Sequence, residues 1–295
     1  MSAGPQQPVV DAQPVPSVGA PGLRRPGEAQ PLCPPFRPAA LRWQVTRDLA
    51  ARAAVVVVMV LLALFGAALD QHTKGPWSMG AMCALVFLWL WINRISIGAA
   101  QQLAQVTSVM DKDPAAAEAG IALALRRWPL QRALRLMLYH RLAALRHRQN
   151  RWAEAAAICR SVLQYPLGQA APVRTHLLFL LAEADLNGGD LAGAHAALLE
   201  LHRVPLSLME VMQRAGLQVR YEVMSGQDAQ ALSNLEQKVQ AAELMPVVQC
   251  GGLHYMLAAA AQRRGEKELA AWLRRRAELF CTPEELALAA RLVRI

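Results

Sequence analysis

Aromatic residues are scarce in this chain of 295 residues: they make up 5% of it, although 54% of all residues are hydrophobic. The imbalance points to alanine and leucine, which favour helices, rather than to the aromatic and β-branched residues that favour strands. This composition predicts an all-α fold and argues against a β-sheet architecture.

Cysteine is also sparse, and its spacing is uninformative. The five cysteines lie far apart, with no CxxC pair and no Cys/His cluster. Their odd number and wide spacing argue against a disulfide framework or a zinc site, and they fit a reducing compartment. We expect most of them to be small buried side chains.

Motifs of known chemistry are missing as well. The sequence contains no HExxH, no GxGxxG or GxxxxGK[ST] phosphate loop and no GxSxG nucleophile elbow. Glu284 and Glu285 are adjacent, so on a helix they point apart and cannot act as an acid–base pair. We therefore predict that the protein is not an enzyme and that it uses no cofactor and no metal.

Proline is concentrated at the start of the chain. The first 39 residues hold 10 of the 18 prolines and few large apolar side chains. Such a segment cannot bury enough surface to offset the entropy lost on ordering, so we predict a disordered tail over residues 1–39. A flexible tail and a docking arm for a proline-binding groove both fit this composition, and no clear PxxP core favours the docking arm.

Two runs without a charged residue follow, at residues 53–69 and 77–92. They contain 17 and 16 residues, at the short end of what a membrane-spanning helix needs. A helix satisfies every backbone polar group within the segment, as lipid requires. The short link between the runs contains Gly75-Pro76 and forces an antiparallel hairpin. We predict a membrane hairpin over residues 40–97 with spans at about 53–69 and 77–93; two buried helices in a soluble core are the alternative.

Positive charge flanks the outer ends of this hairpin. Three arginines precede the first run within residues 42–52, Arg94 and Lys112 follow the second run, and the link offers only Lys74. Because basic residues are retained on the cytoplasmic side, we predict a multi-pass protein with both termini in the cytoplasm.

From residue 98 to 295, helical stretches alternate with breaks at a regular period. Turn-forming residues recur at Asn150, Gly189, Gly226 and Gly265. Prolines fall between them, at Pro129, Pro166, Pro205, Pro246 and Pro283, with separations of 37, 39, 41 and 37 residues. Glycine adopts positive φ at little cost and suits the turn inside a helix pair, and proline ends or begins a pair. The regular alternation of these turn residues and prolines predicts a repeating helix–turn–helix unit.

Small residues recur at fixed offsets, seven residues before and five residues after each turn. They are Ala143, Ala155, Ala182, Ala194, Ala231, Ala258 and Ala270. The unit around Gly226 departs from the pattern, with Gln218 and Val219 where leucine and a small residue are usual. The spacing resembles the tetratricopeptide repeat (TPR) family, with four units over about residues 98–282 and a degenerate unit before them. The resemblance implies an α-solenoid of helix pairs, although the family's period is 34 residues. An irregular all-helical domain with accidental periodicity is the alternative.

In the family that the chain resembles, the first helix of each pair lines a groove that binds peptides or helices of other proteins. Carried over by position, the groove residues are His140, Arg141, His147, Arg148, His176, Glu183, Arg220, Tyr255 and Arg263. This set is net basic, so the resemblance implies an acidic peptide segment as partner, because arginine binds carboxylates at two points. Joint charge reversal of Arg141, Arg148 and Arg220 is expected to abolish partner capture without unfolding. For His140 and His147, a solvated helix face is the alternative.

The last stretch predicts a C-terminal capping helix. Thr282 is the expected N-cap, Pro283 stands at the first helical position, and Glu285 completes a capping box. Arrays of this kind usually end in a cap with a polar outer face. This helix is rather apolar, so its outer face is expected to contact something else, such as a second copy.

Taken together, these patterns predict a membrane-anchored scaffold that recruits a protein partner to the cytoplasmic face of the membrane. The domain order resembles bacterial inner-membrane proteins with a two-helix anchor and a tetratricopeptide domain, which implies a bacterial inner membrane. The alternative is an accessory subunit of a membrane transport, secretion or enzyme complex, packed through small hairpin residues such as Gly66 and Gly80. The net charge of +9 is scattered, and the basic runs lack the interleaved aromatics that stack on bases, so we expect no nucleic-acid partner.

Overall fold

The computed structural model of the protein describes residues 38–73, 77–110, 112–126, 132–168 and 172–287. These residues form helices and connecting turns with no strand among them, so the expected all-α class is confirmed. The predicted disordered tail lies outside the described residues, except that Pro38 and Ala39 already belong to the first helix.

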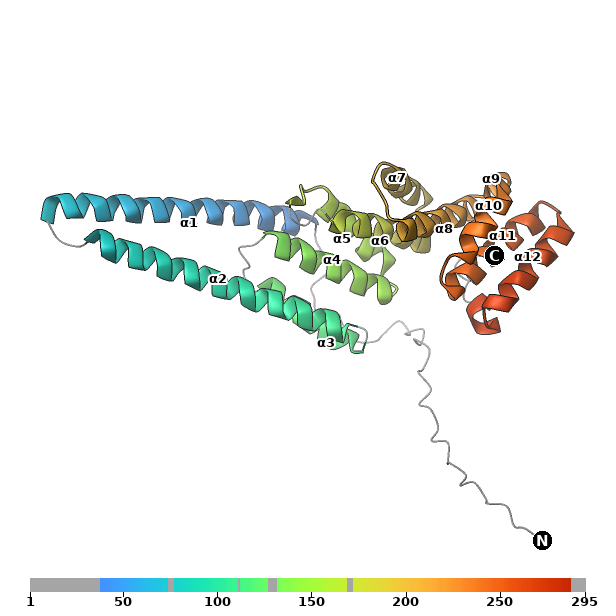
Figure 1. The fold of residues 1–295 in the computed structure, drawn as a ribbon, viewed down its shortest axis with the longest axis horizontal. Helices are drawn as coiled ribbons and strands as arrows, with labels where there is room; N and C mark the ends of the chain where they lie inside the picture. Colours follow the sequence, from blue (N-terminus) through green and yellow to red (C-terminus); the bar gives the residue numbers. More distant parts are fainter. Residues whose placement is uncertain (1–37, 74–76, 111, 127–131, 169–171, 288–295) are drawn as a thin grey trace, which may run out of the picture. The chain divides into compact units, whose positions relative to one another are not determined.

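Figure 1 shows the helices in chain order. Their bounds are α1 Pro38–Thr73, α2 Trp77–Val109, α3 Pro114–Arg126, α4 Arg132–Arg148, α5 Trp152–Leu163, α6 Val173–Gly188, α7 Leu191–His202, α8 Leu208–Met224, α9 Asp228–Leu232, α10 Leu235–Glu243, α11 Val247–Arg263 and α12 Lys267–Phe280.

Helices α1 and α2 pack against each other and contain the two apolar runs. Both helices are longer than the runs. In particular, α2 continues past Arg94 to Val109, so the boundary expected between residues 97 and 98 falls inside a single helix. The apolar part of the hairpin and the start of the helix pairs therefore share one continuous element.

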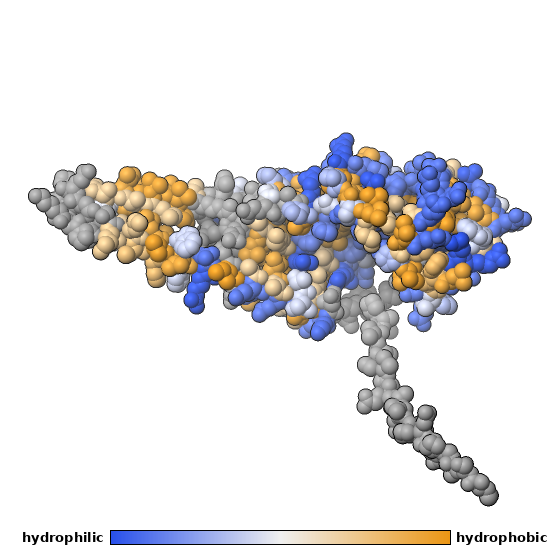
Figure 2. All heavy atoms as spheres, in the orientation of Figure 1, coloured by the Kyte–Doolittle hydropathy of each residue, from blue (hydrophilic) through white to orange (hydrophobic). Residues whose placement is uncertain are grey.

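Large apolar side chains lie on the surface of α1 and α2. Phe65 of α1 is 64% exposed and Phe87 of α2 is 68% exposed, and Figure 2 shows hydrophobic surface over both helices. Gly66, by contrast, is buried. Among the residues that the structure describes, no helix has a segment of sufficient length and apolarity to cross a membrane.

The helices after α3 form consecutive pairs. Helix α4 packs on α5, α6 on α7 and α11 on α12, while α8 is followed by α9 and α10. The residues predicted to turn the chain have positive φ: 57° at Asn150, 83° at Gly189, 74° at Gly226 and 81° at Gly265. This left-handed region costs glycine little and asparagine less than most residues. The predicted turn positions are therefore confirmed.

The small residues of the repeated pattern lie in the interior. All seven alanines are buried. Six of them, all but Ala194, pack among leucines and other apolar side chains in two core clusters, one ending in α7 and the other beginning in α8. Val219 is buried too, while Gln218 donates a hydrogen bond to Glu222 at 3.0 Å. The unit that departs from the pattern differs in another way: Asn234, with φ of 51°, separates α9 from α10.

Several helix starts are capped by side chains. The Thr282 backbone N–H donates to Oε2 of Glu285 at 2.8 Å, and the Glu285 N–H donates to Oγ1 of Thr282 at 3.4 Å. The predicted capping box is therefore confirmed; beyond residue 287 the predicted helix lies outside the described residues. In the degenerate first unit, Asp113 accepts two backbone N–H groups at the start of α3, and Ala117 is buried.

Candidate partner-binding site

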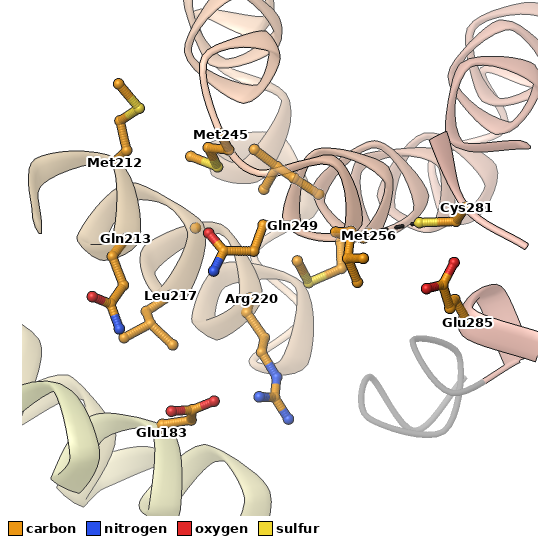
Figure 3. A pocket seen from close by; sticks show the side chains of 14 residues that line it. Glu183, Met212, Gln213, Leu217, Arg220, Met245, Gln249, Met256, Cys281 and Glu285 are labelled. Atoms are coloured by element: carbon orange, nitrogen blue, oxygen red, sulfur yellow. Dashed lines mark hydrogen bonds between the residues drawn. The ribbon is translucent and has the colours of Figure 1, made fainter. Parts of the chain in front are cut away.

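A pocket of about 270 Å³ is lined by the first helices of three consecutive pairs, α6, α8 and α11, and by the residues that precede and follow the last pair. Figure 3 shows its labelled side chains. Most of its wall is apolar; the apolar lining consists of Met212, Leu217, Met245, Val248, Leu253 and Met256. Ligand pockets are typically apolar with a few polar groups placed around them, and this pocket has that character.

Two glycines inside helices keep this pocket open. Gly216 of α8 and Gly252 of α11 both line it, and a Cβ added at either position would meet no atom within 4 Å. Glycine in a helix interior lowers stability by about 0.5–1 kcal/mol relative to alanine. The two glycines that leave the pocket open therefore reduce the stability of the folded state. The neighbouring Gly251 differs, because a Cβ there would collide with Sγ of Cys281; this glycine is required for packing.

A polar network joins α4, α6 and α8 beside the pocket. Nε2 of His147 lies 3.7 Å from the Glu183 carboxylate and 3.4 Å from Nδ2 of Asn187, whose Oδ1 accepts a hydrogen bond from Arg220 at 2.6 Å. Glu183 and Arg220 line the pocket, and the Glu183 carboxylate points toward Arg220 in Figure 3. Burial lowers the pKa of Arg220, and the Glu183 charge opposes this shift. The structure thus brings together three residues expected in the groove: His147, Glu183 and Arg220.

A second group of expected groove residues lies on α4 and α6. The rings of His140 and His176 are 6.4 Å apart. The pKa of His140 is lowered to about 4, chiefly by burial and then by the positive charge of Arg141 and by His176. His140 is therefore neutral at pH 7. The positive charge of α4 comes instead from Arg141, which is half-buried, and from Arg148, which is exposed.

Of the nine expected groove residues, only Glu183 and Arg220 line the pocket; Arg263 and Tyr255 of α11 are among those that do not. Arg263 donates to both carboxylate oxygens of Asp228, at 2.9 and 2.5 Å, and to the Val223 carbonyl at 2.8 Å. It therefore holds the end of α11 to the turn between α8 and α9. Tyr255 is half-buried on α11 and is also outside the pocket lining.

The charge of the pocket differs from the basic groove that the sequence implies. The charged side chains of its lining are two carboxylates, Glu183 and Glu285, and one guanidinium, Arg220. Arg220 is only 8% exposed. Because reversal of a buried, hydrogen-bonded charge is strongly destabilising, a triple reversal that includes Arg220 is expected to disturb the fold, contrary to the expectation from the sequence.

Sequence reasoning overlooks the methionines and glycines of this pocket. The sequence pattern predicts ordinary core positions for Met212, Met245 and Met256, because a helical apolar stripe usually faces the interior. A usable signal lies in Gly216 and Gly252, since a glycine inside a helical pattern costs stability and often has a packing or functional reason.

Comparisons of the chain with protein-family models, with curated proteins and with solved structures find no match. Within the described residues, no group of three or more histidine, cysteine, aspartate or glutamate side chains is arranged to hold a metal ion.

Proposed function

We propose that the protein is a membrane-anchored scaffold, in which the α1–α2 hairpin is immersed in lipid and the helix pairs recruit a protein partner at the cytoplasmic face. The observation that carries the proposal is the exposed apolar surface of the hairpin. Trp91 of α2 and Leu64 of α1 are 59% and 62% exposed, together with the two phenylalanines described above. Apolar patches of this kind on a protein surface mark sites of contact with a membrane or another protein.

The arrangement of the helix pairs supports the recruiting role. Turn residues 37 to 39 positions apart, from Asn150 to Gly265, and alanines at fixed offsets from them are the features by which the sequence resembles the tetratricopeptide family. In that family the first helices of successive pairs bind segments of other proteins. Here those helices carry the pocket, the half-buried charge of Arg141 and the exposed charge of Arg148. We propose that acidic residues of the partner pair with these two arginines.

Membrane anchoring is tested by fractionating cells that express the full-length chain. We expect the protein in the membrane pellet after a carbonate wash, and release only by detergent. A double Leu64→Lys/Phe87→Lys variant is expected to shift to the soluble or aggregated fraction. Leu279 of α12 is 80% exposed, so Leu279→Lys is a matched control that should leave the protein in the pellet. Wild-type protein in the aqueous fraction contradicts the proposal.

The orientation of the hairpin is tested with reporter enzymes fused after Ile295. Activity of a cytoplasm-only reporter supports the proposed topology, and activity of a periplasm-only reporter overturns it.

Partner recruitment is tested by crosslinking and mass spectrometry on native membranes. We expect the Arg141→Glu/Arg148→Glu variant to lose a crosslinked protein that the wild type retains. Arg203, which follows the last residue of α7 and is 75% exposed in its side chain, provides the control Arg203→Glu.

The alternative candidate is a subunit of a larger membrane complex that binds through the hairpin itself. Gly80 of α2 favours it, because a Cβ at Gly80 would lie in open space and the backbone can therefore be approached closely. In this case Gly80→Leu should release the partner, whereas the Arg141→Glu/Arg148→Glu variant should retain it. The scaffold proposal predicts the opposite: Gly80→Leu should retain the partner, and the Arg141→Glu/Arg148→Glu variant should lose it.

A further inference from the structure

The pocket between α8 and α11 continues into exposed apolar surface at the starts of both helices. Leu208 and Met209 begin α8 and are 69% and 57% exposed, and Val247 and Val248 begin α11 and are 60% and 55% exposed. Val248 also lines the pocket. Met212, which is one helical turn beyond Leu208 and Met209, lines it as well. Pocket and helix starts thus form one surface, here named the α8–α11 strip.

Two of the three charged side chains that line the pocket, Glu285 and Arg220, already have hydrogen-bond partners within the chain. Glu285 accepts hydrogen bonds from the backbone N–H and Oγ1 of Thr282, at 2.8 and 3.1 Å. Arg220 donates to Asn187, whereas the Glu183 carboxylate lies 3.7 Å from Nε2 of His147, which is beyond hydrogen-bond distance. A charged ligand group would have to compete with these bonds, whereas an uncharged apolar ligand leaves them intact and removes apolar surface from water.

Two features suit the strip to large apolar side chains. Three methionines line the pocket, and their flexible thioether chains adapt to different shapes. The pocket also receives no side chain from Gly216 or Gly252, which face it from the two helices. At its rim, Gln213 and Gln249 carry exposed amides, which are suited to hydrogen bonds with the polar edge of a ligand.

We propose that the α8–α11 strip binds an amphipathic helix of the recruited partner protein, with large uncharged side chains seated in the pocket between Gly216 and Gly252. The surface extends from the pocket over two helix starts, so it matches a row of side chains better than a single group. A helix presents such a row at positions i, i+3 and i+4. This inference rests on the proposed recruiting function and deepens it by naming the chemistry of the partner segment.

The test uses the full-length protein in detergent micelles and a phage-displayed library of 16-residue random peptides. We expect enriched peptides to carry leucine, methionine or phenylalanine pairs spaced three or four residues apart. Gly216→Leu and Gly252→Leu fill the pocket from opposite helices, and each is expected to weaken binding of a selected synthetic peptide about tenfold or more, because burial of one large apolar side chain contributes about 1.5–3 kcal/mol. Replacement of the paired peptide residues by alanine should have a similar effect.

Arg203→Glu is the control, since Arg203 is exposed and does not line the pocket; it should change the peptide dissociation constant less than about twofold, as is usual for a surface substitution. Unchanged binding by both leucine variants, with thermal unfolding like that of the wild type, overturns the inference. Enrichment of acidic peptides that are sensitive only to Arg141→Glu/Arg148→Glu also overturns it but leaves the proposed function intact. Failure of membrane anchoring in the fractionation experiment affects the proposed function and does not change the peptide result.

Discussion

Arg146 of α4 and Glu118 of α3 form a buried ion pair, with 3.1 Å between Nη2 and Oε1 and side chains that are 2% and 6% exposed. Gln149 accepts a hydrogen bond from Arg146 at 2.7 Å and donates one to Glu118 at 3.2 Å. Glu154 of α5 lies 3.3 Å from Nε of the same arginine. A single guanidinium therefore connects three successive helices of the array.

We expect Glu118→Ala to lower the free energy of unfolding by about 3 kcal/mol, because the buried guanidinium of Arg146 loses its most buried partner. Urea unfolding of the full-length protein in mild detergent, followed by circular dichroism, measures the change. The exposed pair of Arg174 and Glu200, 3.4 Å apart, supplies the control: Arg174→Ala should cost less than about 1 kcal/mol. Equal losses in the two variants would show that burial of the first pair has no energetic consequence.

The two kinds of glycine in the array should respond in opposite ways to alanine. Gly265 has φ of 81° and open space beside it, so Gly265→Ala is expected to destabilise by about 1–2 kcal/mol through backbone conformation alone. Gly216 lies inside α8, also with open space beside it, and Gly216→Ala should stabilise by about 0.5–1 kcal/mol. Thermal unfolding of both variants decides the matter; changes of the same sign would contradict the assigned backbone roles.

The turns could be predicted from the sequence because their physics is local. A residue such as Gly189 or Asn150 adopts positive φ more cheaply than others, whichever helices surround it. The capping box of Thr282 and Glu285 is local in the same sense, since both partners lie within one turn. The pocket depends on which faces of α6, α8 and α11 meet, and helical periodicity does not carry that information.

The charges of the groove were harder to predict for a related reason. Position within a repeat assigns Arg220 and Arg263 to the exposed side of the first helices, and this assumes that a charged side chain points to solvent. In the structure Arg220 is buried and bonded to Asn187, whereas Arg263 turns to Asp228. Both partners come from sites 33 and 35 residues away in the chain, so no local pattern indicates them.

Asp185 is expected to make stability depend on pH. Its side chain is 2% exposed, and burial raises its pKa from 3.8 to about 6, although Arg160 opposes the shift. Between these two values the folded state binds more protons than the unfolded state, so the contribution of Asp185 to the free energy of unfolding falls as pH rises. Relative to the wild type, Asp185→Asn should therefore gain stability from about pH 4 to pH 7, by at most about 3 kcal/mol.

Asp190 provides a control of opposite sign for this pH experiment. The Gly193 backbone N–H donates to Asp190 at 2.9 Å and is the main cause of the lowered pKa of this exposed carboxylate. Its contribution is present above the ordinary pKa and is lost as pH falls through the lowered one. Urea unfolding at a series of pH values should thus show Asp190→Asn approaching the wild type only at acidic pH. A flat difference for Asp185→Asn between pH 4 and pH 7 would contradict the shift.

Arg263 and Arg264 are adjacent, but the structure gives them different roles. Arg263 binds both Asp228 oxygens and the Val223 carbonyl, whereas Arg264 forms an exposed pair with Glu266 at 3.2 Å. Hydrogen bonds to charged groups contribute about 1.5–3 kcal/mol when protected, and less when partly exposed. We therefore expect Arg263→Ala to destabilise by about 1–2 kcal/mol and Arg264→Ala by less than about 0.5 kcal/mol. If Arg263 instead belonged to the partner-binding groove, as its position in the repeat implies, Arg263→Ala would unfold like the wild type and lose the partner.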